Sequence, residues 1–397
     1  MRRLELRVLL AAAAVLGFGF LLKEPCAPDA WGGSAADYYR LCYSDIGPLY
    51  FLRGFADGVF PYFGSFDGGY LEYPVLIGLW AWLTAALIGP FGASVVAFVH
   101  LTWAASAGML LVTVWLLSKW SGLEGRAKWF ALSPALLLTV TINWDALAVL
   151  AAVAGLWWWQ RNRPGWAGVA IGIGVAAKLY PALLLIPMLI DGYESGRWRA
   201  GARAALAAAG TWLAINLPFI LFARDGWWEF FRFSRERGID FGSPWLALRY
   251  LADLDFSTGF ANLAGVVAMA IAIAALFLLR KRLDVATAGF ALVAVFALVN
   301  KVYSPQYWLW LTPLAALSAV RLREFAIWQL AELGYFIGIW RYLLHYADPT
   351  WDGAIGDRTY GLVIAVHWLA TAWLVGVAGW RSGKSRSSAM ASGTLRP

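Results

Sequence analysis

The sequence predicts an all-α polytopic membrane protein, and three observations lead to that class. Hydrophobic residues make up 61% of the 397-residue chain and charged residues 14%, whereas an ordinary soluble domain carries about 25% charge. Apolar runs of roughly 15 to 25 residues recur, which is the length that a helix needs to cross about 30 Å of hydrocarbon. The runs lack the alternating pattern of a membrane β-barrel. From their number we expect about twelve transmembrane helices.

The first run follows a basic start, in the stretch "MRRLELRVLLAAAAVLGFGFLL". A secretory signal peptide has the same order of basic and apolar residues, but no small-x-small cleavage motif follows here. We therefore expect this segment to remain as the first transmembrane helix.

Basic residues gather in alternate connections between the apolar runs. Such connections face the cytoplasm by the positive-inside rule, so both termini are expected inside and the number of crossings is even. The net charge of +8 then needs no nucleic-acid partner. The basic groups are Arg2, Arg3 and Arg7; Lys119, Arg126 and Lys128; Arg161 and Arg163; Arg197, Arg199 and Arg203; Arg280, Lys281 and Arg282; Arg321 and Arg323; and Arg381, Lys384, Arg386 and Arg396.

The two long connections on the other side are expected to be external, at residues 23–72 and 222–256. Both contain amphipathic aromatic pieces that suit helices lying on the membrane surface. The parity of crossings also requires that only one of the segments 73–89 and 94–118 spans the membrane. We assign 73–89 to the outer interface or a partial insertion, because it is shorter, rich in Trp and opened by proline.

The domain organisation that we expect is simple. Residues 1–380 form one transmembrane domain. Residues 381–397, "RSGKSRSSAMASGTLRP", are polar and are expected to be a disordered cytoplasmic tail.

Cys26 and Cys42 are the only cysteines and both fall in the first external loop. An extracytoplasmic pair favours a disulfide, and the alternative is two buried reduced thiols. The three histidines show no metal-ligand spacing with each other or with the cysteines. We expect neither a metal nor a cofactor.

Asp45 is the first chemical candidate, in the stretch "RLCYSDIGPLYFLRG". A carboxylate at the membrane edge can accept a proton from an attacking hydroxyl or hold a cation. The alternative is a helix cap, because Ser44 and Asp45 stand just before an amphipathic helix. The residues alone favour the cap.

Asn143 and Asp145 form a second candidate, in "TINWDALAVL", where two short helices meet on the outer side. Their oxygens could bind sugar hydroxyls or a hard cation. Here too the alternative is a cap, for the returning helix.

Lys178 and Lys301 share a context, because each is followed by x-Tyr and then by a proline, in "AAKLYPALLL" and "VNKVYSPQYWLW". A lysine at an outer helix end can bind phosphate as a point charge. Snorkelling to the interface explains one such lysine easily and two matching contexts less well. Arg341 adds positive charge on the same side.

Five motifs in order, "YSDI", "EYP", "NWDALA", "AAKLYP" and "NKVYSPQYWLW", resemble the bacterial membrane glycosyltransferases of family 87. The resemblance extends from the first helix to "RYLLHY" and is strongest with actinobacterial members. It implies a GT-C fold with a long first external loop. It also implies a polyprenyl-phosphate-sugar donor, a glycolipid or glycan acceptor, membrane lipids as partners, and a site on the extracytoplasmic face of the plasma membrane.

The resemblance also implies roles for individual residues. Asp45 would be the general base of one inverting displacement, and Lys178, Lys301 and Arg341 would hold the donor phosphate. The sugar or acceptor would be bound by Glu72, Tyr73, Asn143, Asp145, Tyr303, Gln306, Tyr307 and His345.

The sequence departs from one branch of this family at Gln306 and Tyr307. Enzymes of phosphatidylinositol mannoside synthesis carry a histidine-bearing "SPxSW" stretch there, so the chain is not expected to use that acceptor. Mannose is the first donor sugar that we expect, with arabinofuranose as the alternative. A polyprenyl-lipid transporter also has many crossings, but charge at one membrane face and the lack of an evident inverted repeat favour a one-sided active site.

Overall fold

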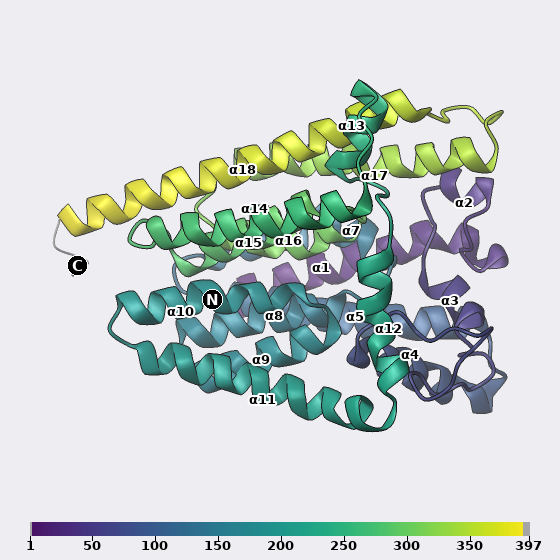
Figure 1. Cartoon of the computed structure of the whole chain (residues 1–397), viewed down its shortest axis with the longest axis horizontal. Helices are drawn as coiled ribbons and strands as arrows, with labels where there is room; N and C mark the ends of the chain where they lie inside the picture. The colour runs from purple at the N-terminus through teal and green to yellow at the C-terminus, as the bar shows by residue number, and fades with distance from the viewer. Residues whose placement is uncertain (1, 392–397) are drawn as a thin grey trace.

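The computed structural model describes residues 2–391 of the chain. Within that range every regular element is helical, apart from one isolated bridge between Phe66 and Gly69. The long helices run side by side along the longest axis of the molecule (Figure 1).

Five helices are long and apolar enough to cross a membrane: α1 (Arg2–Lys23), α5 (Val95–Ser118), α11 (Trp198–Phe222), α14 (Thr258–Leu278) and α18 (Asp357–Ala391). Shorter apolar helices pack among them: α4 (Val75–Ile88), α8 (Ala146–Gln160), α9 (Pro164–Ala177), α15 (Val285–Val299) and α16 (Tyr307–Leu317). The predicted all-α polytopic membrane class is confirmed. The figure of about twelve crossings stays a prediction.

The connections rich in Lys and Arg lie together at one end of the bundle, which we call the basic end. Lys119 after α5 pairs with Glu5 of α1 at 2.6 Å, and Arg280 after α14 pairs with Glu194 of α10 (Leu185–Glu194) at 2.6 Å. Arg381 of α18 pairs with Glu324 of α17 (Leu322–Ala347). α1 begins and α18 ends toward this end in Figure 1. These connections therefore share one face, as the charge pattern predicts.

The last helix extends into the tail that we expect to be disordered. α18 is helical up to Ala391, and residues 392–397 lie outside the described part of the chain. Arg381 donates to Glu324, and Ser382 Oγ donates to Asp284 at 2.9 Å. The first polar residues of the tail thus bind the ends of neighbouring helices. A disordered tail over 381–397 stays a prediction.

The first external loop is compact and lies at the end opposite the basic end. It contains α2 (Ala35–Tyr39) and α3 (Ile46–Leu52), and a disulfide joins Cys26 to Cys42 with Cα atoms 6.1 Å apart. Trp31 Nε1 donates to the carbonyl of Lys23 at 2.7 Å and so fixes the loop to the end of α1. The disulfide and this contact hold α3 in place above the bundle.

Helix α4 has both of its ends near this loop. Asn143, which binds Asp45 just before α3, also donates to the Tyr73 hydroxyl two residues before α4. Just beyond α4, the carbonyl of Ala93 accepts a hydrogen bond from Tyr50 of α3 at 3.2 Å. The segment therefore starts and ends at the same side of the molecule, which supports an interfacial position for 73–89.

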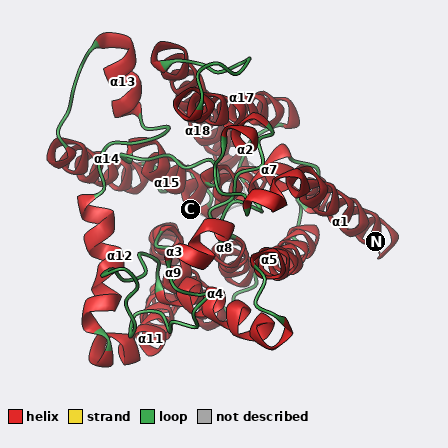
Figure 2. Cartoon of the chain, turned by 90° about the vertical axis from the view of Figure 1, so that its right-hand side faces the viewer, coloured by secondary structure: helices red, strands yellow, loops and turns green. Residues whose placement is uncertain are grey.

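The second long connection contains α12 (Arg224–Glu236) and α13 (Pro244–Ala252). Both helices lie across the direction of the bundle, and Figure 2 shows them lengthwise while the view looks toward the end of the molecule. Such an orientation is typical of helices on a membrane surface. α12 and the residues after it also form one side of the cavity described next.

Candidate functional site

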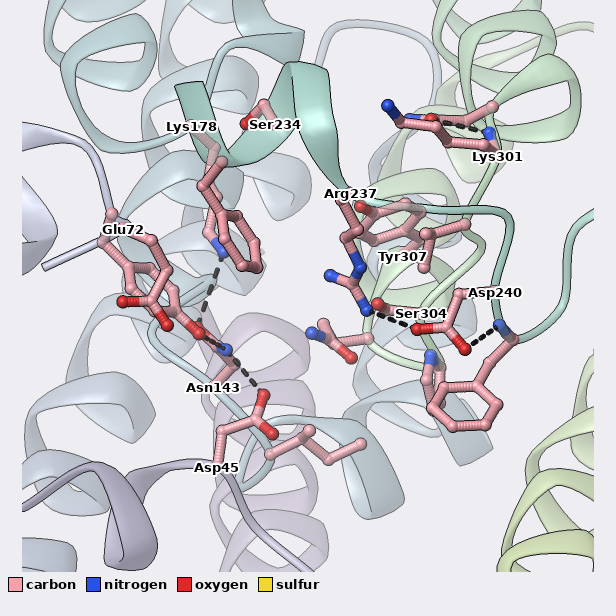
Figure 3. A pocket seen from close by; sticks show the side chains of 18 of the residues that line it. Asp45, Glu72, Asn143, Lys178, Ser234, Arg237, Asp240, Lys301, Ser304 and Tyr307 are labelled. Atoms are coloured by element: carbon pink, nitrogen blue, oxygen red, sulfur yellow. Dashed lines mark hydrogen bonds and ion pairs between the residues drawn. The ribbon is translucent and has the colours of Figure 1, made fainter. Parts of the chain in front are cut away.

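A cavity of about 860 Å³ opens at the end of the molecule opposite the basic end. Five segments that are distant in the sequence line it: the start of α3, the turn before α8, the end of α9, the residues in and after α12, and the loop between α15 and α16. Polar side chains from these segments face one another across the cavity (Figure 3).

Asp45 stands immediately before α3, but its side chain does not cap that helix. Ser44 takes the capping role instead, because its Oγ accepts a hydrogen bond from Ile46 N at 3.2 Å. Asp45 Oδ1 accepts from the Tyr43 hydroxyl at 2.9 Å, and Oδ2 accepts from Asn143 Nδ2 at 2.7 Å. The helix-cap alternative for the Asp45 side chain is therefore wrong.

Asn143 connects several polar groups of this wall. Its Nδ2 donates both to Asp45 and, at 2.8 Å, to the Tyr73 hydroxyl. Its Oδ1 accepts from Trp144 N at 2.7 Å and lies 3.5 Å from Lys178 Nζ. The amide is buried and has a partner for each of its atoms, so its orientation is fixed.

Lys178 and Asp145 form an ion pair beneath Asn143, with Nζ 3.5 Å from Oδ1. Asp145 precedes α8 without capping it, and its Oδ1 accepts from Trp310 Nε1 at 2.7 Å. Lys178 ends α9 and lies 5.0 Å from the centre of the Tyr73 ring. The positive charge of Lys178 is thus offset within this wall by Asp145.

Burial raises the pKa of Asp45 above its ordinary value of 3.8, although the hydrogen bonds from Asn143 and Tyr43 and the charge of Lys178 lower it. Burial also raises the pKa of Tyr43, with a further contribution from Asp45. Tyr43 therefore keeps its proton and acts as a donor to the carboxylate. A carboxylate with a raised pKa is a better proton acceptor than an exposed one.

The opposite wall carries Arg237, Asp240 and Lys301. Arg237 Nη2 contacts Asp240 Oδ2 at 3.2 Å, and Lys301 Nζ donates to the carbonyl of Arg235 at 2.8 Å. Burial lowers the pKa of Lys301, and the charge of Arg237 lowers it further. Two backbone hydrogen bonds hold the wall together, from Asp240 N to Lys301 O at 2.9 Å and from Tyr303 N to Phe241 O at 2.8 Å.

Aromatic and polar side chains complete the cavity. Tyr307 stacks on Trp310 with ring centres 3.9 Å apart, and Tyr180 stacks on Trp310 at 4.4 Å. Gln306 lines the cavity beside them. Flat aromatic faces next to amide and hydroxyl groups suit the binding of a sugar ring.

Glu72 lines the rim and is bound by Arg53, whose Nε and Nη2 donate to the two carboxylate oxygens at 2.6 Å each. This bidentate pair neutralises Glu72 and joins the end of α3 to the residues before α4. Glu72 is therefore placed to hold the rim, with its oxygens already occupied by a cation.

Four predicted site residues do not line this cavity: Asp145, described above, Tyr303, Arg341 and His345. Arg341 lies against Tyr39, with its guanidinium 4.6 Å from the ring centre, and His345 packs edge-on against Tyr346. Tyr303 is buried, and its hydroxyl donates to Glu332 at 3.0 Å. Trp340 and Leu343 of α17 line the cavity, whereas Arg341 projects from a different face of that helix. The structure thus separates Arg341 from Lys178 and Lys301.

Arg237 and Asp240 are site residues that we did not predict. The sequence shows three arginines near the end of α12, at 232, 235 and 237, with no pattern that singles out one of them. In the structure Arg232 pairs with Glu229 at 2.8 Å, whereas Arg237 lines the cavity. The position of Arg237 could have indicated a functional role, because Arg237 follows the last residue of α12 and so lies in a loop, where functional residues are common.

Asn143→Ala is expected to move the acid limb of the pH–rate profile to higher pH. The hydrogen bond from Asn143 lowers the pKa of Asp45, so its loss raises that pKa and protonates the carboxylate over a wider acid range. Since only the deprotonated form accepts a proton, the rate on the acid side should fall, by about tenfold for a lost bond to a charged group. The measurement is kcat against pH.

Tyr73→Phe is the matched control for Asn143→Ala. It removes the other acceptor of Asn143 and leaves the bond to Asp45 in place. Its acid limb should stay where the wild type has it. If the acid limb does not move in Asn143→Ala, Asn143 does not influence the pKa of the proton acceptor, and the prediction is wrong.

The fold and the cavity define a polytopic membrane protein with a polar site at one end. A family model, described as glycosyltransferase family 87, matches residues 69–300, which is more than half of the chain. The chain therefore belongs to glycosyltransferase family 87. No curated protein matches it. Asp45 and Lys301 lie outside the matched range, so their assignment depends on the cavity geometry.

Proposed function

We propose that the protein transfers a sugar, with mannose as the first candidate, from a polyprenyl-phosphate donor to a hydroxyl of a lipid or glycan acceptor. The observation that carries the proposal is the buried carboxylate of Asp45, which faces Arg237 and Lys301 across one cavity. A glycosyl transfer with a phosphate leaving group needs a proton acceptor for the incoming hydroxyl and cations for the departing phosphate.

The reaction is a single displacement with inversion. An acceptor hydroxyl gives its proton to Asp45 while its oxygen forms a bond to the anomeric carbon of the donor. The bond from that carbon to the phosphate oxygen breaks, and its electron pair leaves with the polyprenyl phosphate. Each charge that appears has a counterpart in the cavity, and no enzyme nucleophile is required.

The phosphate is placed in this proposal near Arg237 and Lys301. Lys178 is less suited to hold it alone, because Asp145 already offsets its charge. Arg237 has one carboxylate partner, Asp240, and Lys301 donates to a neutral carbonyl, so this wall offers the larger uncompensated positive charge. Lys178 is assigned to orienting Asn143 and limiting the negative charge around Asp45.

The sugar and the acceptor would occupy the space between the two walls. Gln306 offers an amide group there, and Tyr307 offers a ring face and a hydroxyl. Asn143, whose amide atoms already have partners, is assigned to holding Asp45. Tyr73 and Glu72 lie at the side where an acceptor would enter. The cavity is at the end opposite the basic end, so the positive-inside rule places the reaction on the extracytoplasmic face of the cell membrane, with both termini in the cytoplasm.

The proposal is tested with purified protein in nanodiscs, given polyprenyl-phosphate-mannose or decaprenyl-phosphate-arabinofuranose and a mixture of lipid acceptors. Transfer from one donor with inversion at the anomeric carbon is the expected result. If neither donor supports transfer and a labelled polyprenyl lipid instead crosses the bilayer, the protein is a transporter and the proposal fails.

A further inference from the structure

A second hollowed region lies at the basic end, between the first turns of α9 and α11. Two adjoining hollows, of about 800 Å³ and 900 Å³, open there. They share Asn162, Pro164, Trp198, Arg199 and Arg203. We call this region the arginine groove. It lies at the other end of the helices from the cavity that contains Asp45, and the proposed function assigns no role to it.

The two helices that form the groove are held together just beyond it. A Cβ atom on Gly168 of α9 would lie 2.1 Å from the carbonyl oxygen of Ala204, and one on Gly172 would lie 2.6 Å from that of Ala208. The backbones of α9 and α11 are therefore in direct contact at these glycines. The arginines of the groove stand at the edge of this helix contact. The position of the groove is therefore set by the packing of α9 against α11.

Arg163, Arg199 and Arg203 are three of the four arginines that line the groove, and the fourth, Arg197, is paired with Asp191. Arg199 and Arg203 are four residues apart on α11 and so lie on one face of that helix. All three side chains are exposed, and among the described residues none of them has a hydrogen bond or an ion pair. The groove therefore concentrates positive charge that the protein itself does not neutralise.

Other basic side chains at the same end are used differently. Arg126 donates to the carbonyl of Ala316 at 3.1 Å, Arg280 pairs with Glu194, and Arg381 pairs with Glu324. Arg197, which lines the second hollow, binds Asp191 and Asn162. Among the described residues, Arg163, Arg199 and Arg203 differ from these neighbours in having no hydrogen bond or ion pair of their side chains, although Arg199 lies 5.4 Å from the centre of the Trp198 ring.

The groove also has an apolar side. Trp166 and Trp198 line it and are 60% and 61% exposed. Leu206, one turn further along α11, is 73% exposed, and Val169 lies opposite on α9. Tryptophans at this depth are typical of the membrane–water interface. A site for a free anion would not need this apolar continuation toward the middle of the helices.

We propose that the arginine groove binds the headgroup of an anionic phospholipid, with its acyl chains along Val169 and Leu206. The phosphate would contact Arg163, Arg199 and Arg203, near the positive N-terminal ends of α9 and α11. The lipid would come from the leaflet at the basic end, away from the Asp45 cavity. A lipid bound in the groove would thus stabilise the contact between α9 and α11. Lys178 of the Asp45 cavity directly follows the last residue of α9.

The test uses the full-length protein in detergent with phosphatidylglycerol, and native mass spectrometry counts the lipids that stay bound. Wild type should retain phosphatidylglycerol in preference to phosphatidylcholine. Arg163→Gln, Arg199→Gln and Arg203→Gln together should weaken that binding, by about fivefold for each arginine removed. The control variant combines Arg7→Gln, Lys128→Gln and Lys281→Gln, which removes the same charge from exposed positions outside the groove; it should bind as the wild type does.

Two results would overturn the proposal. Equal loss in the control variant would mean that general surface charge attracts the lipid. Displacement by inorganic phosphate as effective as that by phosphatidylglycerol would mean a simple anion site.

A second measurement needs no arginine variant. Phosphatidylglycerol with brominated chains should quench wild-type tryptophan fluorescence more than it quenches Trp166→Phe/Trp198→Phe, and equal quenching would also contradict the site. Glycosyl transfer by the arginine variant in excess acyl lipid should match that of the wild type, so this test fails or succeeds separately from the proposed function.

Discussion

Asp45→Asn is expected to reduce kcat by about 10² to 10⁴-fold, which is the range for loss of a general base. The amide has the shape of the carboxylate, but only one of its two terminal atoms is an oxygen, so it can accept one of the two hydrogen bonds that Tyr43 and Asn143 donate to the carboxylate. It cannot take up a proton from the acceptor hydroxyl. The loss should therefore appear in kcat, with the KM for the polyprenyl-phosphate donor little changed.

Asp57→Asn is the matched control, because Asp57 lies in the same external loop, is exposed and does not line the cavity. It should transfer sugar as the wild type does. Thermal unfolding of both variants should begin near the wild-type temperature. Undiminished transfer by Asp45→Asn would remove Asp45 from the mechanism and leave the proton acceptor to be sought elsewhere in the cavity.

Arg237→Gln combined with Lys301→Gln is expected to produce the second largest effect. If these cations hold the donor phosphate, their loss removes charge-assisted hydrogen bonds, each of which contributes about 1.5 to 3 kcal/mol. The double variant should raise the donor KM. Its kcat/KM should fall at least 100-fold, which corresponds to a loss of about 2.7 kcal/mol of transition-state stabilisation. The KM for the acceptor should change little.

Arg232→Gln is the control for this pair, because Arg232 belongs to α12, which Arg237 directly follows, is about half exposed, and is paired with Glu229 and Glu236 away from the cavity. Asp240→Asn offers a test in the opposite direction. It removes the carboxylate that competes with phosphate for Arg237, so the donor KM should fall. If Lys178→Gln raises the donor KM more than the double variant does, the phosphate lies at the Asp45 wall instead.

The class of the protein could be predicted from the composition and hydropathy of its sequence. Crossing a bilayer requires long apolar helices, and this requirement leaves a direct record in the sequence. The clustering of the basic connections at one end follows for the same reason, since the charge bias is set connection by connection. The disulfide partners were also predictable, because the chain has only two cysteines and both fall in one loop.

The site could be predicted only in part. Asp45, Asn143, Lys178 and Lys301 do meet at one cavity. Asp145, Tyr303, Arg341 and His345 do not line it, and Arg237 and Asp240 were missed. In each case the decision depends on the direction in which a side chain leaves its helix or loop, and spacing along the sequence does not give that direction when the neighbouring elements are unknown.

The sequence by itself determined that this is an all-helical membrane protein of glycosyltransferase family 87 with basic connections on one face, because hydrophobic length, charge bias and ordered motifs are local properties. Only the tertiary structure decided what Asp45 does in the fold. Its residue type and position before α3 suit a helix cap, and that interpretation fails because Asn143, distant in the sequence, holds the carboxylate toward the cavity. A carboxylate caps its helix or faces a cavity according to the partners that the rest of the fold brings to it.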